Sequence, residues 1–465
     1  MFSQYLVILL SCAGYAYSKT ALAHFMVQSS YAYNLQQWKT DMASAKQMNL
    51  DGFALNWTPP DCQQPYLRWM ATQIDTAFQA AEQSGFLLTH SFDMSYSECD
   101  YFWNTTYMSD ILNRHAKSSA NLRWNNKIVV TTFGGDSVQS YNDGFFQDLK
   151  DKMNYFGNPI SLTPGFNSFS ERAQSDNGIA EAQSLISNYT SLDGFLNWQA
   201  WPLQKRQNLT CQVDEAFHSA LKTGKKTGPY IMAISPWQFK NIPSSTSWLS
   251  YSDTLFPDRL LNLASSTFAP DMVELISWND YGESHYLRNL PSPSISATDY
   301  ITYASGMQNY ILNMSHAPWR ILAKYYLGWW KTGAMPKATM DQVVFWYRVH
   351  PRAATCTGQL GQSIGGSAFP DDAVFLWALV KETSTISVDV GANKGWTFVA
   401  EGGKATFSRV PFPGDLGAGV VPEVRILRGG KTVAEGAGRL NITAGCDWYN
   451  FNPVVNLVGE GVNRE

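Results

Sequence analysis

The stretch MVELISWNDYGES, residues 272–284, holds the pattern that decides the fold. It begins as an apolar run and ends in a polar loop with two carboxylates, an asparagine, a tryptophan and a tyrosine. Seven comparable apolar runs precede it, at residues 21–27, 52–57, 86–93, 127–135, 159–166, 193–198 and 229–237. We therefore count eight runs, each of a length that suits a buried β-strand.

Helical patterns occupy the segments between these runs. Between the first two, apolar residues recur every three or four positions, as on one face of a helix: Leu35, Trp38, Met42, Ala45 and Met48. Nearly continuous apolar strands that alternate with helices indicate a parallel sheet buried on both faces, and eight such units close a (β/α)8 barrel of the TIM type. A doubly wound open sheet is the alternative, but no G-x-G-x-x-G motif follows the first run.

The pattern changes toward the C-terminus. A helical segment at about 300–333 is divided or kinked by Pro318. After Pro336 the chain consists of short runs rich in Val and Phe and broken by Gly, which is typical of a β-sandwich. We predict a signal peptide at 1–18, a catalytic α/β barrel at 19–335 and a β-sandwich accessory domain at 336–465.

Several features predict secretion. Residues 1–18 contain an apolar segment followed by small residues, as in a cleaved signal peptide. No later stretch provides eighteen uninterrupted apolar residues, so we expect no membrane span. The chain also has six N-glycosylation triplets, at Asn56, Asn104, Asn188, Asn208, Asn313 and Asn441.

The cysteines agree with an oxidising compartment. Removal of the signal peptide leaves five, and the simplest pairing joins Cys62 to Cys99 and Cys356 to Cys446. Cys211 is then the unpaired thiol.

The amino-acid composition limits the kinds of molecule that the protein is expected to bind. The chain of 465 residues has 38 acidic and 34 basic residues, a net charge of −4 and no basic stripe, so we expect no nucleic-acid partner. Charged residues are only 15%, whereas aromatic residues reach 14% with 17 Trp. This surplus suits a secreted protein that stacks its rings on a polysaccharide, although large cores also use Trp and Phe. We expect the protein to be a monomer.

The barrel prediction indicates where the active site lies. Active sites of such barrels lie at the carboxyl ends of the strands. The residues there are polar or aromatic: Asn56, Trp57, Asp93, Phe133, Asp136, Asn167, Trp198 and Trp237. A single Asn or Asp at a strand end often caps the next helix, and a single Trp often covers the barrel mouth. The set as a whole indicates a sugar site.

Asp280 and Glu283 are the natural catalytic candidates within this set. Glycoside hydrolysis needs one carboxylic acid to protonate the leaving oxygen and one carboxylate to activate water or attack the sugar. Burial beside Trp278 and Tyr281 would keep one of the two protonated, and His285 is a plausible polar support.

Other chemistries fit less well. The seven His residues lack paired metal-ligand spacing and no Walker A loop occurs, so we expect neither a metal nor another cofactor. The segment GQSIG at 361–365 matches a G-x-S-x-G nucleophile elbow around Ser363, but the strand, helix and partners that this motif needs are not evident.

Several segments together resemble one known family. They are AHFMVQSSYAY, DGFALNW, SFDMSY, TPGFN, DGFLNWQAWP, SPWQFK and ELISWNDYGESHYL. This set is similar to the fungal α-1,3-glucanases, or mutanases, of glycoside hydrolase family 71. The resemblance implies endo-acting hydrolysis of α-1,3-glucan with inversion, Asp280 and Glu283 as the catalytic pair, and Asp93 as a third essential acid.

Some alternatives stay open at this level. The longer side chain of Glu283 slightly favours it as the acid and Asp280 as the base. Residues three apart on a helical turn have Cβ atoms about 5–6 Å apart, so sequence spacing does not establish inversion. A wall-glucan-binding protein with little turnover is the main alternative function, and an esterase acting through Ser363 is a distant third.

Overall fold

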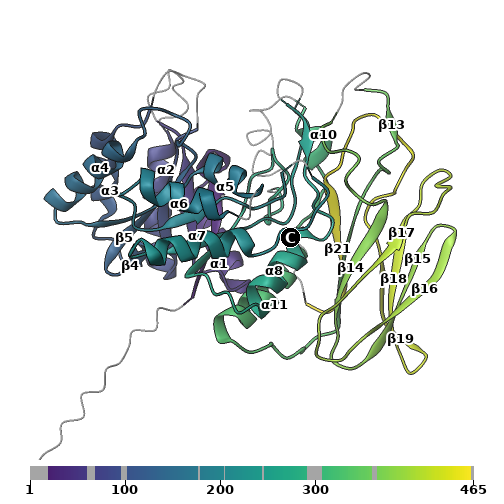
Figure 1. Ribbon diagram of the computed structural model, residues 1–465. Coiled ribbons are helices and arrows are strands. Elements are labelled where there is room, and N and C mark those ends of the chain that lie inside the picture. Colours follow the sequence, from purple (N-terminus) through teal and green to yellow (C-terminus); the bar gives the residue numbers. More distant parts are fainter. Residues whose placement is uncertain are drawn as a thin grey trace, which may run out of the picture.

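The computed structural model describes residues 19–59, 69–95, 102–175, 178–203, 205–242, 246–290, 306–358 and 364–461. Figure 1 shows an α/β part that contains the N-terminal two thirds of the chain, beside a C-terminal part made of antiparallel strands. The predicted signal peptide, Cys62, Cys99 and Ser363 lie outside the described residues.

All eight predicted strands are present and lie in one curled sheet. They are β1 (Thr20–Met26), β2 (Gly52–Trp57), β3 (Leu87–Asp93), β5 (Lys127–Phe133), β6 (Ile160–Gly165), β7 (Phe195–Asn197), β8 (Tyr230–Ile234) and β11 (Met272–Leu275). Their order is β6-β5-β3-β2-β1-β11-β8-β7, and every pairing along it is parallel. The ninth strand of this sheet, β4 (Arg123–Trp124), pairs antiparallel with β5 and was not predicted.

The two ends of this sheet approach each other. The backbone N–H groups of Asp193 and Gly194, just before β7, donate to the Leu162 carbonyl of β6 at 2.9 and 3.0 Å. The Leu162 N–H donates in turn to the Asp193 carboxylate at 3.0 Å. These contacts draw the outer strands together, so the sheet curls around a central axis.

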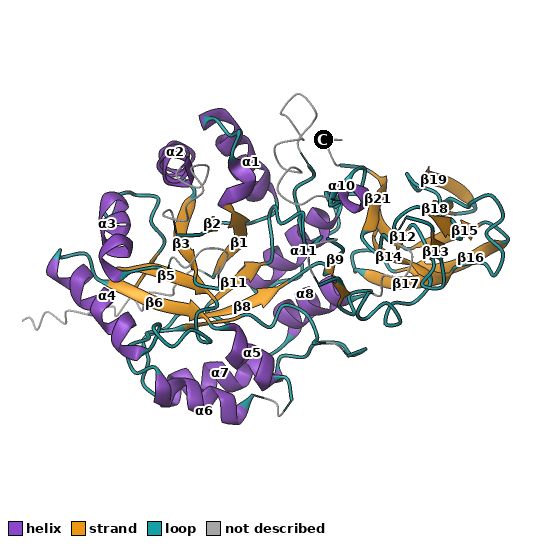
Figure 2. Cartoon of the chain, turned by 90° about the horizontal axis from the view of Figure 1, so that it is seen from above, coloured by secondary structure: helices purple, strands orange, loops and turns teal. Residues whose placement is uncertain are grey.

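Helices cover the outside of the sheet (Figure 2). They are α1 (Leu35–Gln47), α2 (Trp69–Ser84), α3 (Thr105–His115), α4 (Asp143–Tyr155), α5 (Asn167–Ala173), α6 (Ile179–Asn188), α7 (Gln212–Thr223) and α8 (Leu255–Ser265). Helix α1 begins at a capping box, because Asn34 accepts from the Gln37 N–H and Gln37 bonds back to the Asn34 N–H. Its buried face includes Trp38, Met42 and Ala45, as the spacing predicts.

The interior of the curled sheet is apolar at its base. Leu22, Leu196, Ile231 and Met272 come from four different strands and pack into one buried cluster. Further along β1 the interior residues become His24 and Met26, which line a pocket. The strands therefore present an apolar base and a polar mouth.

The C-terminal part contains two four-stranded antiparallel sheets. The first has the order β17 (Thr406–Pro411), β14 (Ala373–Leu379), β12 (Gln342–Arg348) and β21 (Pro453–Gly459). The second has the order β16 (Asn393–Ala400), β15 (Ser384–Val390), β18 (Pro422–Arg428) and β19 (Lys431–Ala437). Both contribute to one buried apolar cluster that includes Val343, Leu376, Ile386 and Ile426.

A disulfide links two short strands of this C-terminal part. It joins Cys356 of β13 (Thr355–Cys356) to Cys446 of β20 (Gly445–Cys446), as predicted. Among the described cysteines Cys211 is the free one, also as predicted.

The first C-terminal sheet packs against the α/β part through helix α11 (Trp319–Thr332). The Trp319 and Trp346 rings lie 6.0 Å apart, and the Tyr325 and Trp377 rings 5.6 Å apart. Pro318 is the N-cap of α11, so it begins this helix rather than kinking it, and the short α10 (Gln308–Ile311) precedes it. The two parts thus share a buried aromatic core.

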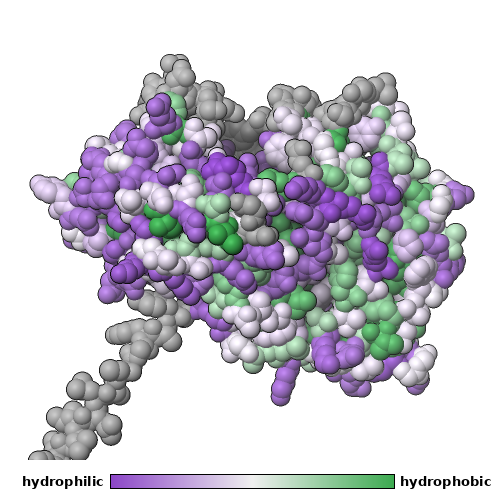
Figure 3. Space-filling model, viewed as in Figure 1, coloured by the Kyte–Doolittle hydropathy of each residue, from purple (hydrophilic) through white to green (hydrophobic). Residues whose placement is uncertain are grey.

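Three further observations concern membrane crossing, surface hydropathy and glycosylation. In the residues that the structure describes, no helix has both the length and the apolar content needed to cross a membrane. In Figure 3 the hydrophobic side chains on the visible face form scattered groups within a largely hydrophilic surface. Among the six glycosylation triplets Asn56 is 1% exposed, so a glycan at this residue is incompatible with the fold.

The buried carboxyl group of Asp253 should make the stability of the protein depend on pH. Burial raises the pKa of this carboxyl to about 7, although a hydrogen bond from the Asp371 N–H and the Arg348 charge oppose the rise. The contribution of Asp253 to the free energy of unfolding is fully present below about pH 3.9, the pKa of an Asp in the unfolded chain. This contribution is lost as the pH rises through about 7. We expect Asp253→Asn to gain melting temperature relative to the unmodified protein between about pH 5 and about pH 8. Thermal unfolding across this range checks the expectation, and a constant difference would contradict it.

Candidate active site

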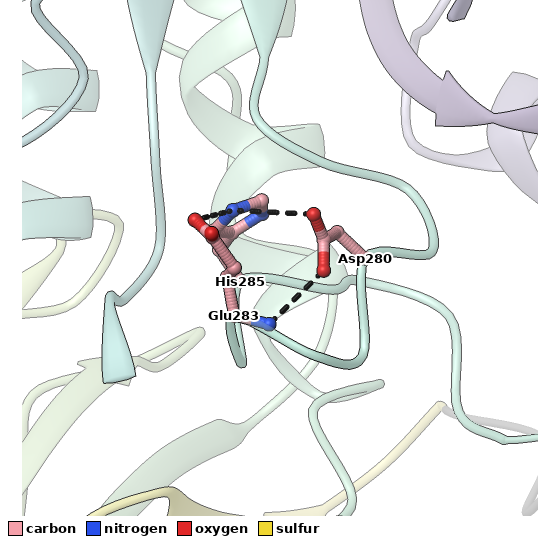
Figure 4. A group of neighbouring side chains, drawn as sticks. All are labelled: Asp280, Glu283 and His285. Carbon is pink, nitrogen blue, oxygen red and sulfur yellow. Dashed lines mark hydrogen bonds and ion pairs between the residues drawn. The ribbon is translucent and has the colours of Figure 1, made fainter. Parts of the chain in front are cut away.

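The loop after β11 brings three polar side chains together (Figure 4). His285 Nε2 lies 3.8 Å from Asp280 Oδ2 and 3.5 Å from Glu283 Oε2, so the imidazole contacts both carboxylates. The Glu283 N–H donates to Asp280 Oδ1 at 3.0 Å. Ser284, between Glu283 and His285, has a left-handed φ of 60°, a conformation that non-glycine residues rarely adopt.

The residues before this cluster fasten the loop to the sheet and to helix α1. The Asn279 side chain accepts from the Met26 N–H at 2.7 Å and donates to the Met26 carbonyl at 3.1 Å. Trp278 Nε1 donates to Asp41 Oδ2 of α1 at 3.0 Å. Because both side chains are fully buried, the backbone that carries Asp280 and Glu283 is held rigidly.

Two residues from another segment contact Glu283. Gln238 Nε2 donates to Glu283 Oε2 at 2.9 Å, and Lys240 Nζ lies 3.6 Å from Glu283 Oε1. Lys240 belongs to β9 (Phe239–Lys240), which pairs antiparallel with β10 (Trp248–Leu249) in a short hairpin that the sequence analysis did not predict. This hairpin therefore supplies positive charge to the site.

These contacts move the two carboxyl pKa values in opposite directions. Burial raises the pKa of Asp280, and the nearby charge of Glu283 adds to the rise while His285 opposes it. Burial by itself would also raise the pKa of Glu283, but the hydrogen bond and charge of His285, together with Lys240 and Gln238, lower it overall. Glu283 therefore loses its proton at a lower pH than Asp280 does.

A pocket of about 460 Å³ opens over this cluster at the carboxyl ends of the strands. Six of the residues predicted for the site line it: Asn56, Asp93, Trp198, Asp280, Glu283 and His285. Phe133 and Asn167, two further strand-end candidates, line it as well. The tertiary structure therefore brings together residues from β2, β3, the position directly after β7 and the loop after β11.

Five predicted residues do not line this pocket. Trp57 is fully buried among aromatic rings, including Trp103 with its centroid at 5.1 Å. Trp237 Nε1 donates to the Phe451 carbonyl, so this ring lies in the core shared with the C-terminal sheets. Asp136 accepts from the Phe169 N–H at the start of α5, which is a capping contact.

The other two of these five belong to the candidate loop itself. Trp278 is fully buried beside Phe53, and Tyr281 is 3% exposed with its ring 5.0 Å from Tyr286. None of the five lines this pocket, so their predicted contacts with substrate stay predictions.

Several pocket residues were missed by the sequence analysis. They are His24, Met26, Ser170, Glu171, Gln174, Trp201, Leu203, Trp248 and Ser250. Trp201 stacks against His285 with ring centroids 5.4 Å apart, and the Lys240 ammonium lies 4.9 Å from the Trp248 ring. The strand-end rule could have found His24 and Met26, since both lie near the end of the first apolar run.

The Asp280, Glu283 and His285 cluster also has the spacing of a metal site. One ligand atom from each residue lies within 4.8 Å of the others. The Lys240 ammonium beside Glu283 disfavours a further cation there, because like charges repel. The absence of a metal stays a prediction.

A curled parallel sheet with paired carboxylates and partly exposed tryptophans at its carboxyl edge fits the requirements of a glycoside hydrolase. The family described as Glycosyl hydrolase family 71 matches residues 17–464, and the chain belongs to this family. The resemblance predicted from the sequence segments is confirmed.

Curated relatives cover nearly the whole chain. A mutanase of Penicillium rubens is 30% identical over 456 residues, which is 96% of this chain and 90% of that protein. A glucan endo-1,3-alpha-glucosidase of Schizosaccharomyces pombe is 28% identical, with 95% of both chains covered. An ascus wall endo-1,3-alpha-glucanase of the same yeast is 26% identical, over 94% of this chain and 96% of that protein.

Proposed function

We propose that this protein hydrolyses α-1,3-glucan at internal bonds, outside the cell or in the cell wall, with the pocket over Asp280 and Glu283 as its active site. The names of the three relatives support the substrate class. The observation that carries the proposal is the pair of carboxyl groups whose pKa values move apart inside this pocket. An acid and an ionised carboxylate side by side are what glycoside cleavage requires.

In this proposal Asp280 is the general acid. Its raised pKa makes it the carboxyl group that keeps a proton to the higher pH, whereas His285 and Lys240 lower the pKa of Glu283. Side-chain length alone favoured Glu283 as the acid and Asp280 as the base. We reverse this assignment, because the charges around a carboxyl group affect its pKa more than one additional methylene group affects its reach. The ionised Glu283 would stabilise the positive charge that develops on the sugar ring.

The stereochemical proposal is inversion with Asp93 as the base. An oxygen of Asp280 and one of Glu283 lie within 4.8 Å of each other. Inverting enzymes separate their two carboxyl groups by about 6.5–9.5 Å to leave room for the attacking water. The expectation that Asp280 and Glu283 alone form the inverting pair therefore does not fit their spacing, and Asp93 lines the same pocket from the end of β3.

Three tryptophans supply binding surfaces in the proposal. Trp198, Trp201 and Trp248 line the pocket and are neither fully buried nor fully exposed. Aromatic faces of this kind present apolar area to the C–H side of a sugar ring. We assign them to glucose units on either side of the cleaved bond.

The proposal also covers the domain organisation, the signal peptide and the oligomeric state. The contacts between β6 and the start of β7 support a closed (β/α)8 barrel at 19–335, and the two C-terminal sheets support a β-sandwich at 336–465. We further propose that 1–18 is a cleaved signal peptide and that the protein is a monomer.

The test is incubation of the purified protein with insoluble α-1,3-glucan. We expect reducing ends to accumulate as a mixture of oligosaccharides, with the β-anomer formed first in proton NMR of the early products. Binding to the glucan without new reducing ends would favour the alternative, a wall-glucan-binding protein. First formation of the α-anomer would mean retention and would make Glu283 the nucleophile.

A further inference from the structure

A buried contact between a histidine and a glutamate reaches the wall of the pocket and takes no part in the mechanism described above. His24 Nδ1 contacts Glu274 Oε1 at 2.7 Å, and the two side chains come from the adjacent strands β1 and β11. Glu274 is fully buried and His24 is 3% exposed. Within the described residues, Glu274 Oε2 has no hydrogen-bond partner.

Such a pair contributes little as a purely structural element. Desolvation of a buried carboxylate costs several kcal/mol, and a well-packed apolar pair of similar volume is often as stable. The apolar cluster beside it, with Leu22 and Met272, shows that the same two strands fill the interior of the sheet with hydrocarbon elsewhere. A polar pair at this level of the sheet therefore points to a ligand.

The orientation of the imidazole directs one nitrogen to that ligand. A carboxylate only accepts hydrogen bonds, so Nδ1 carries the proton in the contact with Glu274. The ring also packs edge-on against Trp198, with centroids 5.0 Å apart. His24 lines the pocket together with Asp280 and Glu283, and Nε2 is the ring atom left for a bound molecule.

A neighbouring side chain gives independent support. Asn56 of β2 is 1% exposed and lines the same pocket, yet neither Oδ1 nor Nδ2 has a partner in the described part of the chain. Buried amide groups are almost always hydrogen-bonded, so this one is complete only when a ligand supplies the partner. Asn56 pairs with Met26, two residues beyond His24, so both polar groups line one wall of the pocket.

We propose that His24 Nε2 binds a hydroxyl group of the glucose unit at the cleaved bond, and that Glu274 is the positioning residue that holds the imidazole. This inference rests on the proposed function and deepens it. A sugar hydroxyl both donates and accepts, so it matches Nε2 in either protonation state.

The test compares α-1,3-linked glucose tetrasaccharide with analogues that lack single hydroxyl groups at the 2, 4 or 6 position of the glucose at the cleavage site. We expect the unmodified protein to lose about 10- to 100-fold in kcat/KM on one of these analogues. In His24→Phe this penalty should largely vanish, because the ring is kept but no nitrogen is left to bond the hydroxyl. Glu274→Leu should reduce the penalty more than Glu274→Gln, which keeps an acceptor for Nδ1.

A matched control is Tyr230→Phe, which removes a buried hydrogen bond to Asp214 from β8 at a residue outside the pocket lining. It should keep the full penalty. Calorimetry gives the Kd of each oligosaccharide, and the ratio of Kd between an analogue and the unmodified tetrasaccharide measures the same penalty without cleavage. If the protein did not cleave the substrate, the proposed function would be overturned, but the binding data would still test the role of His24. Should His24→Phe fail to fold, Glu274→Leu and Glu274→Gln provide the comparison. An unchanged penalty in the folded variants would overturn this inference.

Discussion

Asp280→Asn should lower turnover of α-1,3-glucan by about 10²–10⁴-fold while the protein stays folded. The amide has nearly the shape of the carboxyl group, and its oxygen can still accept from the Glu283 N–H that now donates to Asp280 Oδ1. What it loses is the transferable proton that the raised pKa of Asp280 keeps available. Initial rates of reducing-end formation measure the loss, and circular dichroism checks the fold.

A substrate that needs no proton separates the role of Asp280 from that of Glu283. An α-1,3-linked disaccharide fluoride has a leaving group that departs without protonation, so Asp280→Asn should cleave it at a rate close to that of the unmodified protein. Glu283→Gln should be slow on both substrates, because it removes charge stabilisation from the sugar ring. An equal loss on both substrates in Asp280→Asn would reject the acid role, and normal turnover of glucan would remove Asp280 from the chemistry altogether.

Arg259→Leu should destabilise the protein by about 3–5 kcal/mol, because it leaves the buried Asp214 carboxylate without its cation. Both residues are fully buried, and the Arg259 Nη1 and Nη2 atoms each lie 3.0 Å from Asp214 Oδ2. The other Asp214 oxygen accepts from Asn197 at 3.0 Å and from the Tyr230 hydroxyl at 2.8 Å. This network joins α7 and α8 to β7 and β8 at one end of the curled sheet.

Urea unfolding measures the change, and two variants serve as controls. The double variant Arg259→Leu/Asp214→Leu should recover much of the lost stability, since no unpaired charge stays buried. Lys404→Ala removes an exposed partner of Glu401 and should leave the unfolding curve unchanged. If Arg259→Leu unfolded at the same urea concentration as Lys404→Ala, the network would not stabilise the fold.

The sheet was predictable because parallel strands covered on both faces appear as continuous apolar runs. Each of the eight runs became a strand, and the face predicted for α1 is the buried face. The strands β4, β9 and β10 escaped prediction because two residues are too few to display a periodicity.

The candidate site was predictable only in part. The rule that sites lie at strand ends found Asn56, Asp93 and the loop with Asp280 and Glu283. The same rule failed for Trp237, because its ring turns toward Phe451 of the C-terminal part, which is 214 residues away in sequence. It also missed Trp248, whose hairpin reaches the pocket only through tertiary folding.

By itself the amino-acid sequence determined the order of strands and helices, the loop that carries the two carboxylates, the Cys356–Cys446 pairing and the family. These properties depend on residues within one element or on short recurring segments. Only the tertiary structure decided which tryptophans face the pocket and in which directions the pKa values of the two carboxyl groups shift. The exposure and the pKa of a side chain depend on contacts between residues that are distant in sequence, such as Lys240 with Glu283 and Asp41 with Trp278. Local sequence patterns do not predict such contacts.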